Sequence, residues 1–145
     1  MKKNHVFHSL AAVLCLLFLI GMVACGNKEP SDPDLWENAI YTEDTTLGSG
    51  AVTIVLRVEA GEKSINITIK TDKTTLADAL TDHNLVEGER STYGLMIKYV
   101  NGMRADFDLD GAYWALYKNG EYATTGADST EIADGEHYAL VYTKE

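Results

Sequence analysis

The feature that most limits how this chain can fold is a period-two alternation of apolar and polar residues in two successive stretches. In VTIVLRVEA, residues 52–60, and again in INITIK, residues 65–70, apolar side chains recur at every second position. This alternation puts the apolar side chains on one face of a strand and the polar ones on the other, which is typical of half-buried strands. The intervening AGEKS segment can turn the chain. We therefore predict an antiparallel hairpin that buries one face.

Two Asn-Gly pairs predict further hairpins in the second half of the chain. Asn101-Gly102 lies between YGLMIKYV and MRADF, and Asn119-Gly120 lies between AYWALYK and EYATT. A type I′ turn needs positive φ at both central residues, and Asn-Gly meets this need best. In the second hairpin a two-residue turn would set Tyr117 opposite Tyr122, and aromatic pairs of this kind stabilise a hairpin.

One helix is predicted between these strand-rich regions. Thr75 can cap its start, and apolar residues recur at spacings of three and four through residues 76–83. His83 ends this stripe, so we expect it to be partly buried near the helix terminus rather than to bind a ligand. The EHYALVY segment, residues 136–142, predicts a late strand. The order of elements predicts an α+β fold, β-grasp-like, with a mixed sheet of five to six strands and one helix.

The N-terminus has the features of a secretory signal. Lys2 and Lys3 precede an apolar run over residues 11–24, about 14 residues, which is short for a bilayer span of roughly 20. The run ends in MVACG, which resembles the lipobox of bacterial lipoproteins. That resemblance implies cleavage before Cys25, a lipid on its thiol, and a protein anchored in the cell membrane on the extracytoplasmic side. An ordinary signal peptide with a chance cysteine is the alternative.

Cysteine usage and charge limit the possible partners. Cys15 lies inside the signal and Cys25 would carry the lipid, so the mature chain would have no thiol for a disulfide, a metal or catalysis. Loss of residues 1–24 would remove two lysines and no acid, leaving 10 Lys and Arg against 22 Asp and Glu, so the formal charge goes from −10 to −12. An acidic surface excludes nucleic acid as the expected partner.

Composition divides the rest of the chain into a tether and a domain. Residues 25–50 hold both prolines and end in Gly48-Ser49-Gly50, so we predict a flexible tether. Trp36, Ile40 and Tyr41 are exceptions, and their docking on the domain, or a first contact with a partner, stays an alternative. Residues 51–145 are long enough for one core and are predicted to form a single domain.

The segment DFDLDG begins like a calcium loop. Asp106, Asp108, Asp110 and Gly111 have EF-hand spacing, but position 12 of the loop is Tyr117 instead of a bidentate glutamate. The alternatives are a looser calcium loop and a solvated turn, in which Asp favours turn geometry and Gly supplies positive φ. The turn is favoured, and no metal site or calcium dependence is expected.

The aromatic run of residues 113–117 supplies the candidate binding residues. Tyr113 and Tyr117 share one face of the predicted strand, and Trp114 shares the other with Leu116. One face must be core, and Trp114 is predicted to be there. The opposite face, extended by Tyr122, would form an aromatic ledge suited to rings, sugars or protein loops. The candidate ligand-binding residues are Tyr113, Tyr117, Tyr122 and Trp114.

Nothing in the sequence indicates catalysis. The mature chain would keep His83 and His137 but no thiol, and it has no nucleophile elbow, zinc-binding helix pair or phosphate-binding glycine loop. Asp134, Glu136 and His137 are close together around a predicted turn, where solvated charges are usual. We therefore expect a protein that is not an enzyme.

Several of these segments together resemble the transcobalamin-like C-terminal domain family. The segments are TLADAL, YGLMIKYVNG and DGAYWALYKNGEYATTGADSTEIADGEHYALVY, and the resemblance covers about residues 50–143. The family implies a β-grasp-like domain of unknown function in bacterial surface proteins. In vitamin B12 carriers the corresponding domain closes over cobalamin as the smaller partner of a helical domain, which this sequence does not contain. The resemblance implies a module that binds a ring ligand such as a corrinoid, and a protein-interaction or adhesion module is the alternative.

Overall fold

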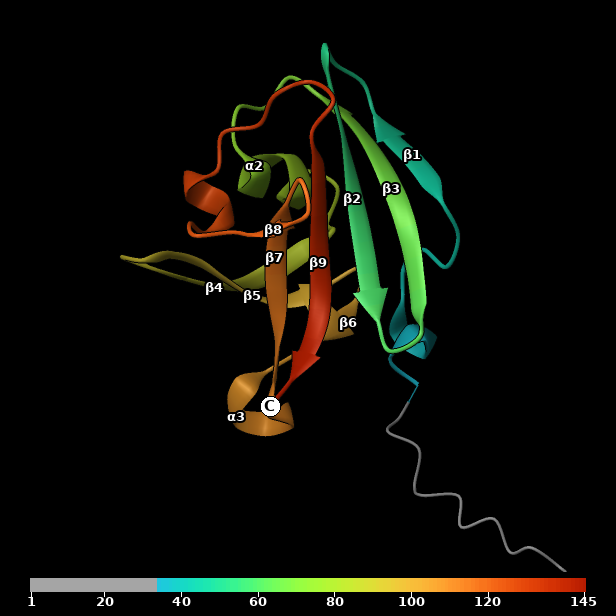
Figure 1. The fold of residues 1–145 in the computed structure, drawn as a ribbon, viewed down its shortest axis with the longest axis vertical. Coiled ribbons are helices and arrows are strands. Elements are labelled where there is room, and N and C mark those ends of the chain that lie inside the picture. Colours follow the sequence, from blue (N-terminus) through green and yellow to red (C-terminus); the bar gives the residue numbers. More distant parts are fainter. Residues whose placement is uncertain (1–33) are drawn as a thin grey trace, which may run out of the picture. The chain divides into compact units, whose positions relative to one another are not determined.

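A mixed six-stranded sheet dominates residues 34–145, the part of the chain that the computed structural model describes (Figure 1). In order across the sheet the strands are β1 (Thr45–Gly48), β3 (Lys63–Thr71), β2 (Val52–Ala60), β9 (His137–Lys144), β7 (Ala112–Lys118) and β8 (Glu121–Tyr122). The predicted signal peptide and Cys25 lie outside the described residues. Within residues 34–145 we find no helix with the length and apolar character needed to cross a membrane.

The hairpin predicted from the alternation is confirmed. β2 and β3 pair antiparallel from Val52 with Thr71 to Ala60 with Lys63. Their inward-facing residues are fully or almost fully buried: Ile54, Leu56, Val58, Ile65, Ile67 and Ile69. β9 pairs parallel with β2 and antiparallel with β7, so the last strand joins the first hairpin to the second half of the chain.

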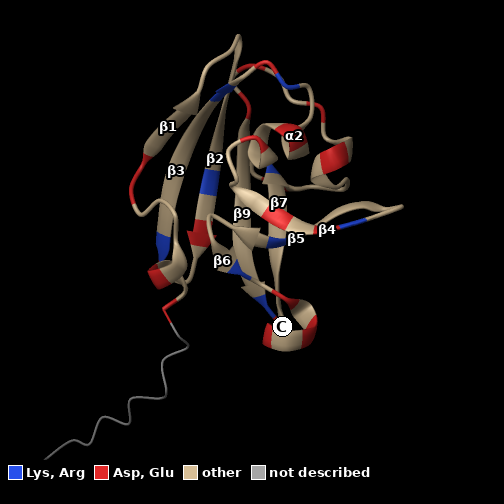
Figure 2. Cartoon of the chain, turned by 180° about the vertical axis from the view of Figure 1, so that it is seen from behind, with Lys and Arg blue, Asp and Glu red and all other residues tan. Residues whose placement is uncertain are grey.

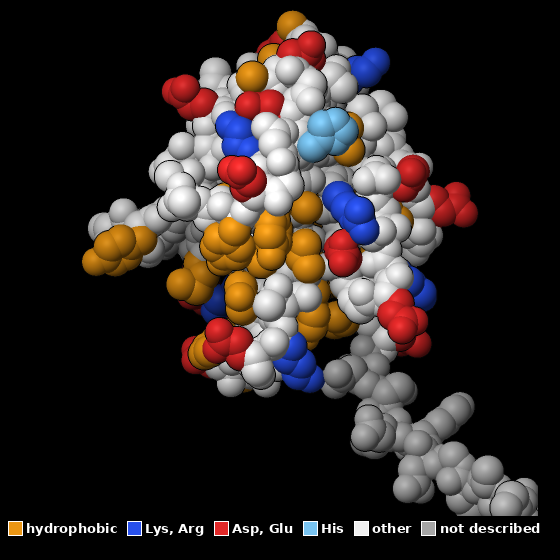
Figure 3. Space-filling model, in the orientation of Figure 1, with side chains coloured by type: hydrophobic (Ala, Val, Ile, Leu, Met, Phe, Trp, Pro, Cys, Tyr) orange, Lys and Arg blue, Asp and Glu red, His pale blue; other side chains and the backbone are white. Residues whose placement is uncertain are grey.

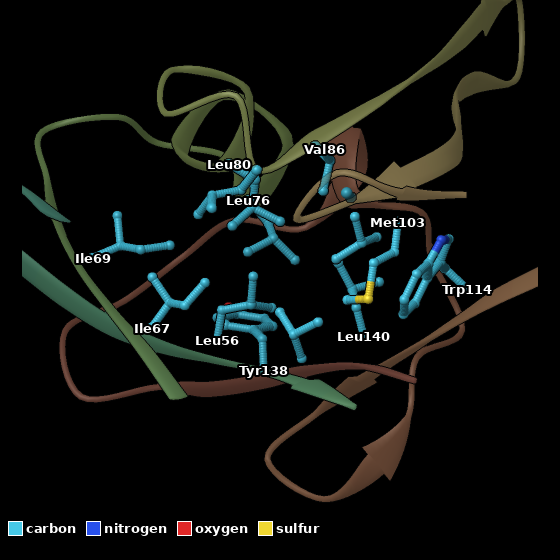
Figure 4. Packing of buried hydrophobic residues seen from close by; sticks show 14 of the residues in the cluster. Leu56, Ile67, Ile69, Leu76, Leu80, Val86, Met103, Trp114, Tyr138 and Leu140 are labelled. Atoms are coloured by element: carbon cyan, nitrogen blue, oxygen red, sulfur yellow. The ribbon is translucent and has the colours of Figure 1, made fainter. Parts of the chain in front are cut away.

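The core lies between the inner face of this sheet and the elements packed on it. Leu76 and Leu80 of α2 (Leu76–Thr81) stand over Leu56, while Met103 lies beside Trp114 (Figure 4). Thr75 caps α2 as predicted, since its hydroxyl accepts from the backbone N–H of Asp78. Full burial of a Leu or Met side chain stabilises the fold by about 1.5–3 kcal/mol. Among the described residues, this cluster forms one continuous core.

The predicted mixed sheet of five to six strands is present, but it is not the only sheet of the described residues. β4 (Val86–Ser91), β5 (Gly94–Val100) and β6 (Met103–Arg104) form a separate antiparallel sheet of three strands. A bulge between Glu87 and Gly88 shifts the register of β4 on β5, and these two strands extend beyond the body of the fold as a hairpin arm (Figure 1). The observed fold is therefore β-rich, with a mixed sheet and a small second sheet.

The prediction of one helix is wrong. A second α-helix, α3 (Phe107–Asp110), occupies the DFDLDG segment, and two short 3-10 turns, η1 (Leu35–Asn38) and η2 (Ala127–Ser129), complete the described residues. α3 forms because Asp106 caps it, accepting from the backbone N–H groups of Asp108 and Leu109 at 3.0 and 3.2 Å. Gly111 ends it with φ 62°, the positive φ expected there.

Residues 34–50 belong to the folded unit and not to a flexible tether. Trp36 of η1 is only 8% exposed, and its indole N–H donates to the carbonyl of Ala60 at 2.9 Å. β1 adds a parallel strand beside β3. The docked alternative for Trp36 is thus the observed one, and the domain begins near residue 34 instead of at Ala51.

Candidate functional site

The outer face of the six-stranded sheet is left uncovered by the described helices and strands. α2 and the small sheet pack on the inner face, whereas β2, β9 and β7 lie open on the other (Figure 1). Paired residues of neighbouring strands share a face, so the register shows which side chains meet there. One row crosses five strands and consists of Asn66, Arg57, Ala139, Tyr117 and Tyr122.

The apolar part of this surface lies over β7, β8 and β9, and we call it the tyrosine face. Its residues are Tyr113, Tyr117, Tyr122, Ala139 and Val141, with the buried Ala115 between them on the same side of β7. Tyr122 is 60% exposed, Tyr113 and Tyr117 are half-buried, and the rings of Tyr117 and Tyr122 meet edge to face at 5.4 Å. A group of hydrophobic side chains is visible near the middle of this side of the molecule (Figure 3). The three tyrosines singled out in the sequence therefore come together on one surface.

A polar border adjoins the tyrosine face on β2 and β3. Arg57 and Glu59 form an ion pair at 3.0 Å, and Asn66 lies next to Arg57 in the row. An open depression of about 540 Å³ joins the border to Tyr117 of the tyrosine face. Its lining includes Val55, Arg57, Glu59, Asn66, Tyr117, His137, Ala139 and Val141. The surface thus offers aromatic area on one side and hydrogen-bonding and charged groups on the other.

Trp114 lies on the opposite side of β7 from the tyrosines. It is 7% exposed and meets the ring of Tyr142 edge to face at 5.6 Å, so the prediction that it belongs to the core is confirmed. Its indole N–H has no hydrogen-bond partner among the described residues. Of the four candidate binding residues, the structure brings the three tyrosines together and separates Trp114 from them.

The carboxylates of the DFDLDG segment are occupied by neighbouring cations and amides. Asp106 pairs with Lys98 at 3.1 Å, and Asp110 pairs with Arg104 at 2.8 and 3.0 Å. The hydrogen bond from Lys98 lowers the pKa of Asp106, and the hydrogen bond from Arg104 lowers the pKa of Asp110. Within residues 34–145 no three His, Cys, Asp or Glu side chains are grouped so that they could hold a metal ion. The segment is a capped helical turn whose carboxylates are ion-paired, whereas the sequence favoured a solvated turn.

The acidic residues around the predicted turn before β9 also have structural partners. Asp134 accepts from the backbone N–H of Thr53 at 2.7 Å. Glu136 accepts from the hydroxyl of Tyr138 and pairs with Lys118 at 3.1 Å. Burial raises the pKa of Glu136, but the hydrogen bonds from Tyr138, a backbone amide and Lys118 outweigh it, so the pKa lies below its usual value. These contacts fix the start of β9 beside β2 and β7.

The two histidines of the described residues lie in different places. His83 is half-buried after α2, packed beside Gly48 of β1, as expected for a histidine near the helix end. His137 is exposed on the outer face of β9, at the edge of the depression. The structure therefore does not combine them into a single site.

Sequence reasoning missed the polar border of the site. Arg57, Glu59 and Asn66 were assigned only to the solvent face of the first hairpin. Their meeting with Tyr117 depends on the parallel pairing of β9 with β2, which joins segments about 80 residues apart in sequence. No local pattern carries that information.

Comparison with known proteins defines the family. Residues 73–144 match the family described as a domain of unknown function (DUF4430). The solved structure of a "putative metal binding protein from Ruminococcus gnavus ATCC 29149" is 32% identical with a TM-score of 0.62, and the match covers 66% of this chain and 99% of that one. The chain belongs to the same family as this Ruminococcus gnavus protein. No curated protein matches its sequence.

A structure of haptocorrin in complex with Cbi shares the fold. It is 20% identical with a TM-score of 0.50, and the match covers 68% of this chain but 26% of haptocorrin. The chain thus corresponds to about a quarter of that protein. At this identity the likeness concerns the fold, and at that level it agrees with the resemblance to transcobalamin-like domains.

Proposed function

We propose that this chain is a non-catalytic binding module, anchored through a lipid on Cys25 at the extracytoplasmic side of the cell membrane, which contacts its ligand through the tyrosine face. The observation that carries the proposal is the uncovered sheet face on which three tyrosines meet. Tyrosine supplies large contact area at low cost in conformational entropy, and its hydroxyl can hydrogen-bond. The acidic residues near His137 are engaged in holding β9, which supports a role without catalysis.

A flat ring ligand with polar substituents, such as a corrinoid, fits this surface best. The depression of about 540 Å³ has the size usual for small-molecule sites. Tyr117 in the depression and Tyr122 beside it offer aromatic surface to a ring, while Arg57 and Asn66 can hydrogen-bond to its substituents. We propose that the fold is β-grasp-like, because α2 packs on the inner face of a mixed sheet. The likeness in fold to haptocorrin, whose structure contains Cbi, supports a ring ligand.

The second candidate function is docking of an extracellular protein, as an interaction or adhesion module. It is favoured by the open shape of the depression. Broad and shallow surfaces rich in tyrosine suit protein loops as well as rings. In both cases the ligand would meet the same residues.

A titration with cobalamin tests the ring-ligand proposal. Residues 26–145 would be mixed with cobalamin, and binding would be read from its visible spectrum and from co-elution in gel filtration. We expect a spectral change that saturates, and a dissociation constant raised about tenfold or more in Tyr122→Ala, equivalent to about 1.4 kcal/mol. Tyr93→Ala is the matched control, because Tyr93 is 99% exposed at the tip of the β4–β5 arm. No spectral change and no co-elution would contradict a corrinoid ligand and favour protein docking.

Cell fractionation tests the anchor. We expect Cys25→Ser to abolish lipid labelling and to leave the protein released or unprocessed. Cys15→Ser is the control, since Cys15 lies within the predicted signal and its loss should change neither labelling nor location. Membrane retention of Cys25→Ser with unchanged labelling would show that the lipobox interpretation is wrong.

A further inference from the structure

The helix α3 presents two large apolar side chains to solvent. Phe107 is 58% exposed and Leu109 is 72% exposed, and no residue of α3 is buried. Single exposed apolar side chains are common on protein surfaces and need no explanation. This pair differs from such single residues because hydrogen bonds fix the turn that carries it and because the turn lies near the start of the described chain.

The pair is held on a rigid turn. The carboxylate of Asp106 accepts from the backbone N–H of Leu109, and the carboxylate of Asp110 accepts two hydrogen bonds from Arg104 and one from the backbone N–H of Asp106. Gly111 closes the helix in the left-handed conformation. A preorganised turn loses little conformational entropy when its apolar side chains bind another surface.

The charges of the turn are largely balanced. Asp106 and Asp110 each pair with a cation, Lys98 and Arg104, while Asp108 has no ion pair among the described residues. Figure 2 shows the acidic residues of α3 close to basic residues of the same end of the domain. This balance suits a zwitterionic surface better than an anionic one, because the chain as a whole is acidic.

α3 lies at the end of the domain where the described chain begins. In Figures 1 and 2, α3 and η1 both lie towards the lower end of the folded unit. Gly102, at the turn before β6, packs directly on the backbone of Asn38 in η1, and β6 leads into α3. Cys25 precedes Asp34 by only residues 26–33, which reach at most about 30 Å when fully extended. A lipid on Cys25 would therefore keep this end close to the membrane.

We propose that α3 is a membrane-contact element, whose Phe107 and Leu109 enter the headgroup region of a zwitterionic phospholipid surface and orient the anchored domain. The inference rests on the lipid anchor proposed above. Weak intrinsic affinity is sufficient, because a short tether gives an effective concentration in the millimolar range. β7 leads away from α3 (Figure 1), so the tyrosine face would stand upright on the membrane and stay open to ligands.

Fluorescence quenching by brominated phosphatidylcholine tests this contact. A chain of residues 25–145 would be coupled through Cys25, its only thiol, to maleimide-bearing phosphatidylethanolamine in phosphatidylcholine vesicles. Leu109→Trp places a reporter on α3, and Tyr93→Trp places the matched reporter on the exposed tip of the β4–β5 arm. The chain with only its native tryptophans gives the background.

We expect the emission of Leu109→Trp to shift to the blue on coupling and to lose intensity with brominated lipid, whereas Tyr93→Trp shows neither change. Quenching of Leu109→Trp no greater than that of Tyr93→Trp would overturn the proposal and leave a protein as the partner of the apolar pair. Because the coupling is chemical, this result does not depend on lipidation in the cell. A failed anchor would be seen separately in the fractionation of Cys25→Ser.

Discussion

Replacement of Trp36 by alanine tests whether the segment before β2 is part of the domain. Trp36 is 8% exposed and donates through its indole N–H to the carbonyl of Ala60. A buried tryptophan covers about 150–250 Å², which corresponds to roughly 4–6 kcal/mol of hydrophobic stabilisation at about 25 cal/mol per Å². Alanine keeps part of that area and the denatured chain is itself partly compact, so we expect a loss of about 3–5 kcal/mol in the free energy of unfolding.

Thermal unfolding of residues 26–145, followed by circular dichroism, measures this loss. For a domain slightly above 100 residues, each 1 kcal/mol lowers the melting temperature by about 4 °C, so Trp36→Ala should melt at least about 12 °C lower. Trp36→Phe keeps an aromatic ring in the core but removes the hydrogen bond to Ala60, and it should lose about 1–2 kcal/mol. Glu37→Ala, at an exposed position of the same turn, should change the free energy of unfolding by less than about 0.5 kcal/mol.

A melting temperature of Trp36→Ala within 2–3 °C of the unchanged chain, roughly the effect of a surface substitution, would refute the reasoning. It would mean that residues 34–50 behave as a tether. The domain would then be held further from the membrane, and the place of α3 near the anchor would lose its support.

Two further predictions concern the hairpin turn and acid stability. Gly120 has φ 84° with open space around it, so Gly120→Val should lower the free energy of unfolding by about 1–3 kcal/mol through backbone strain alone. Gly126→Ala is the control, because Gly126 has φ −70° and is equally open, and it should change this free energy little. Equal melting temperatures of the two variants would contradict the turn assignment. The pKa of Glu136 lies below its usual value of 4.5, so its ionised form stabilises the fold; this contribution is present above about pH 4.5 and is lost as the pH falls through the lower, folded pKa. Lys118→Met removes one cause of the lowered pKa of Glu136, so the melting temperature of this variant should fall less steeply below pH 4.5 than that of the unchanged chain. Parallel curves of melting temperature against pH would contradict a role for the ion pair.

Local patterns were sufficient to predict the strands and turns that build the candidate site. The alternation in residues 52–70 predicted the β2–β3 hairpin, and both Asn-Gly pairs adopt positive φ at both residues. Parity along residues 113–117 correctly separated Trp114 from Tyr113 and Tyr117. These features depend on neighbours in sequence or on a single strand pairing, and so they can be read from composition and spacing.

Long-range contacts account for what the sequence did not show. Trp36 is fixed by Ala60, and the polar composition around it favoured a tether because no nearby residue signals that contact. The separate sheet of β4, β5 and β6 arises because the arm pairs with itself and η2 holds it through Asp128, which bonds to Arg90 at 2.8 Å and to the backbone N–H of Leu95. Strand content alone does not tell one sheet from two.

The most direct test of the tyrosine face is the dissociation constant for cobalamin of Tyr117→Ala, measured together with its melting temperature. Tyr117 lies between Tyr122 and Ala139 in the row that leads to Arg57, so we predict binding weakened about tenfold or more in a variant that still unfolds cooperatively. Trp114→Ala should instead lose the fold, because Trp114 is 7% exposed in the core. Unchanged cobalamin affinity in Tyr117→Ala, or a folded Trp114→Ala that no longer binds, would contradict the assignment of the ligand to this face.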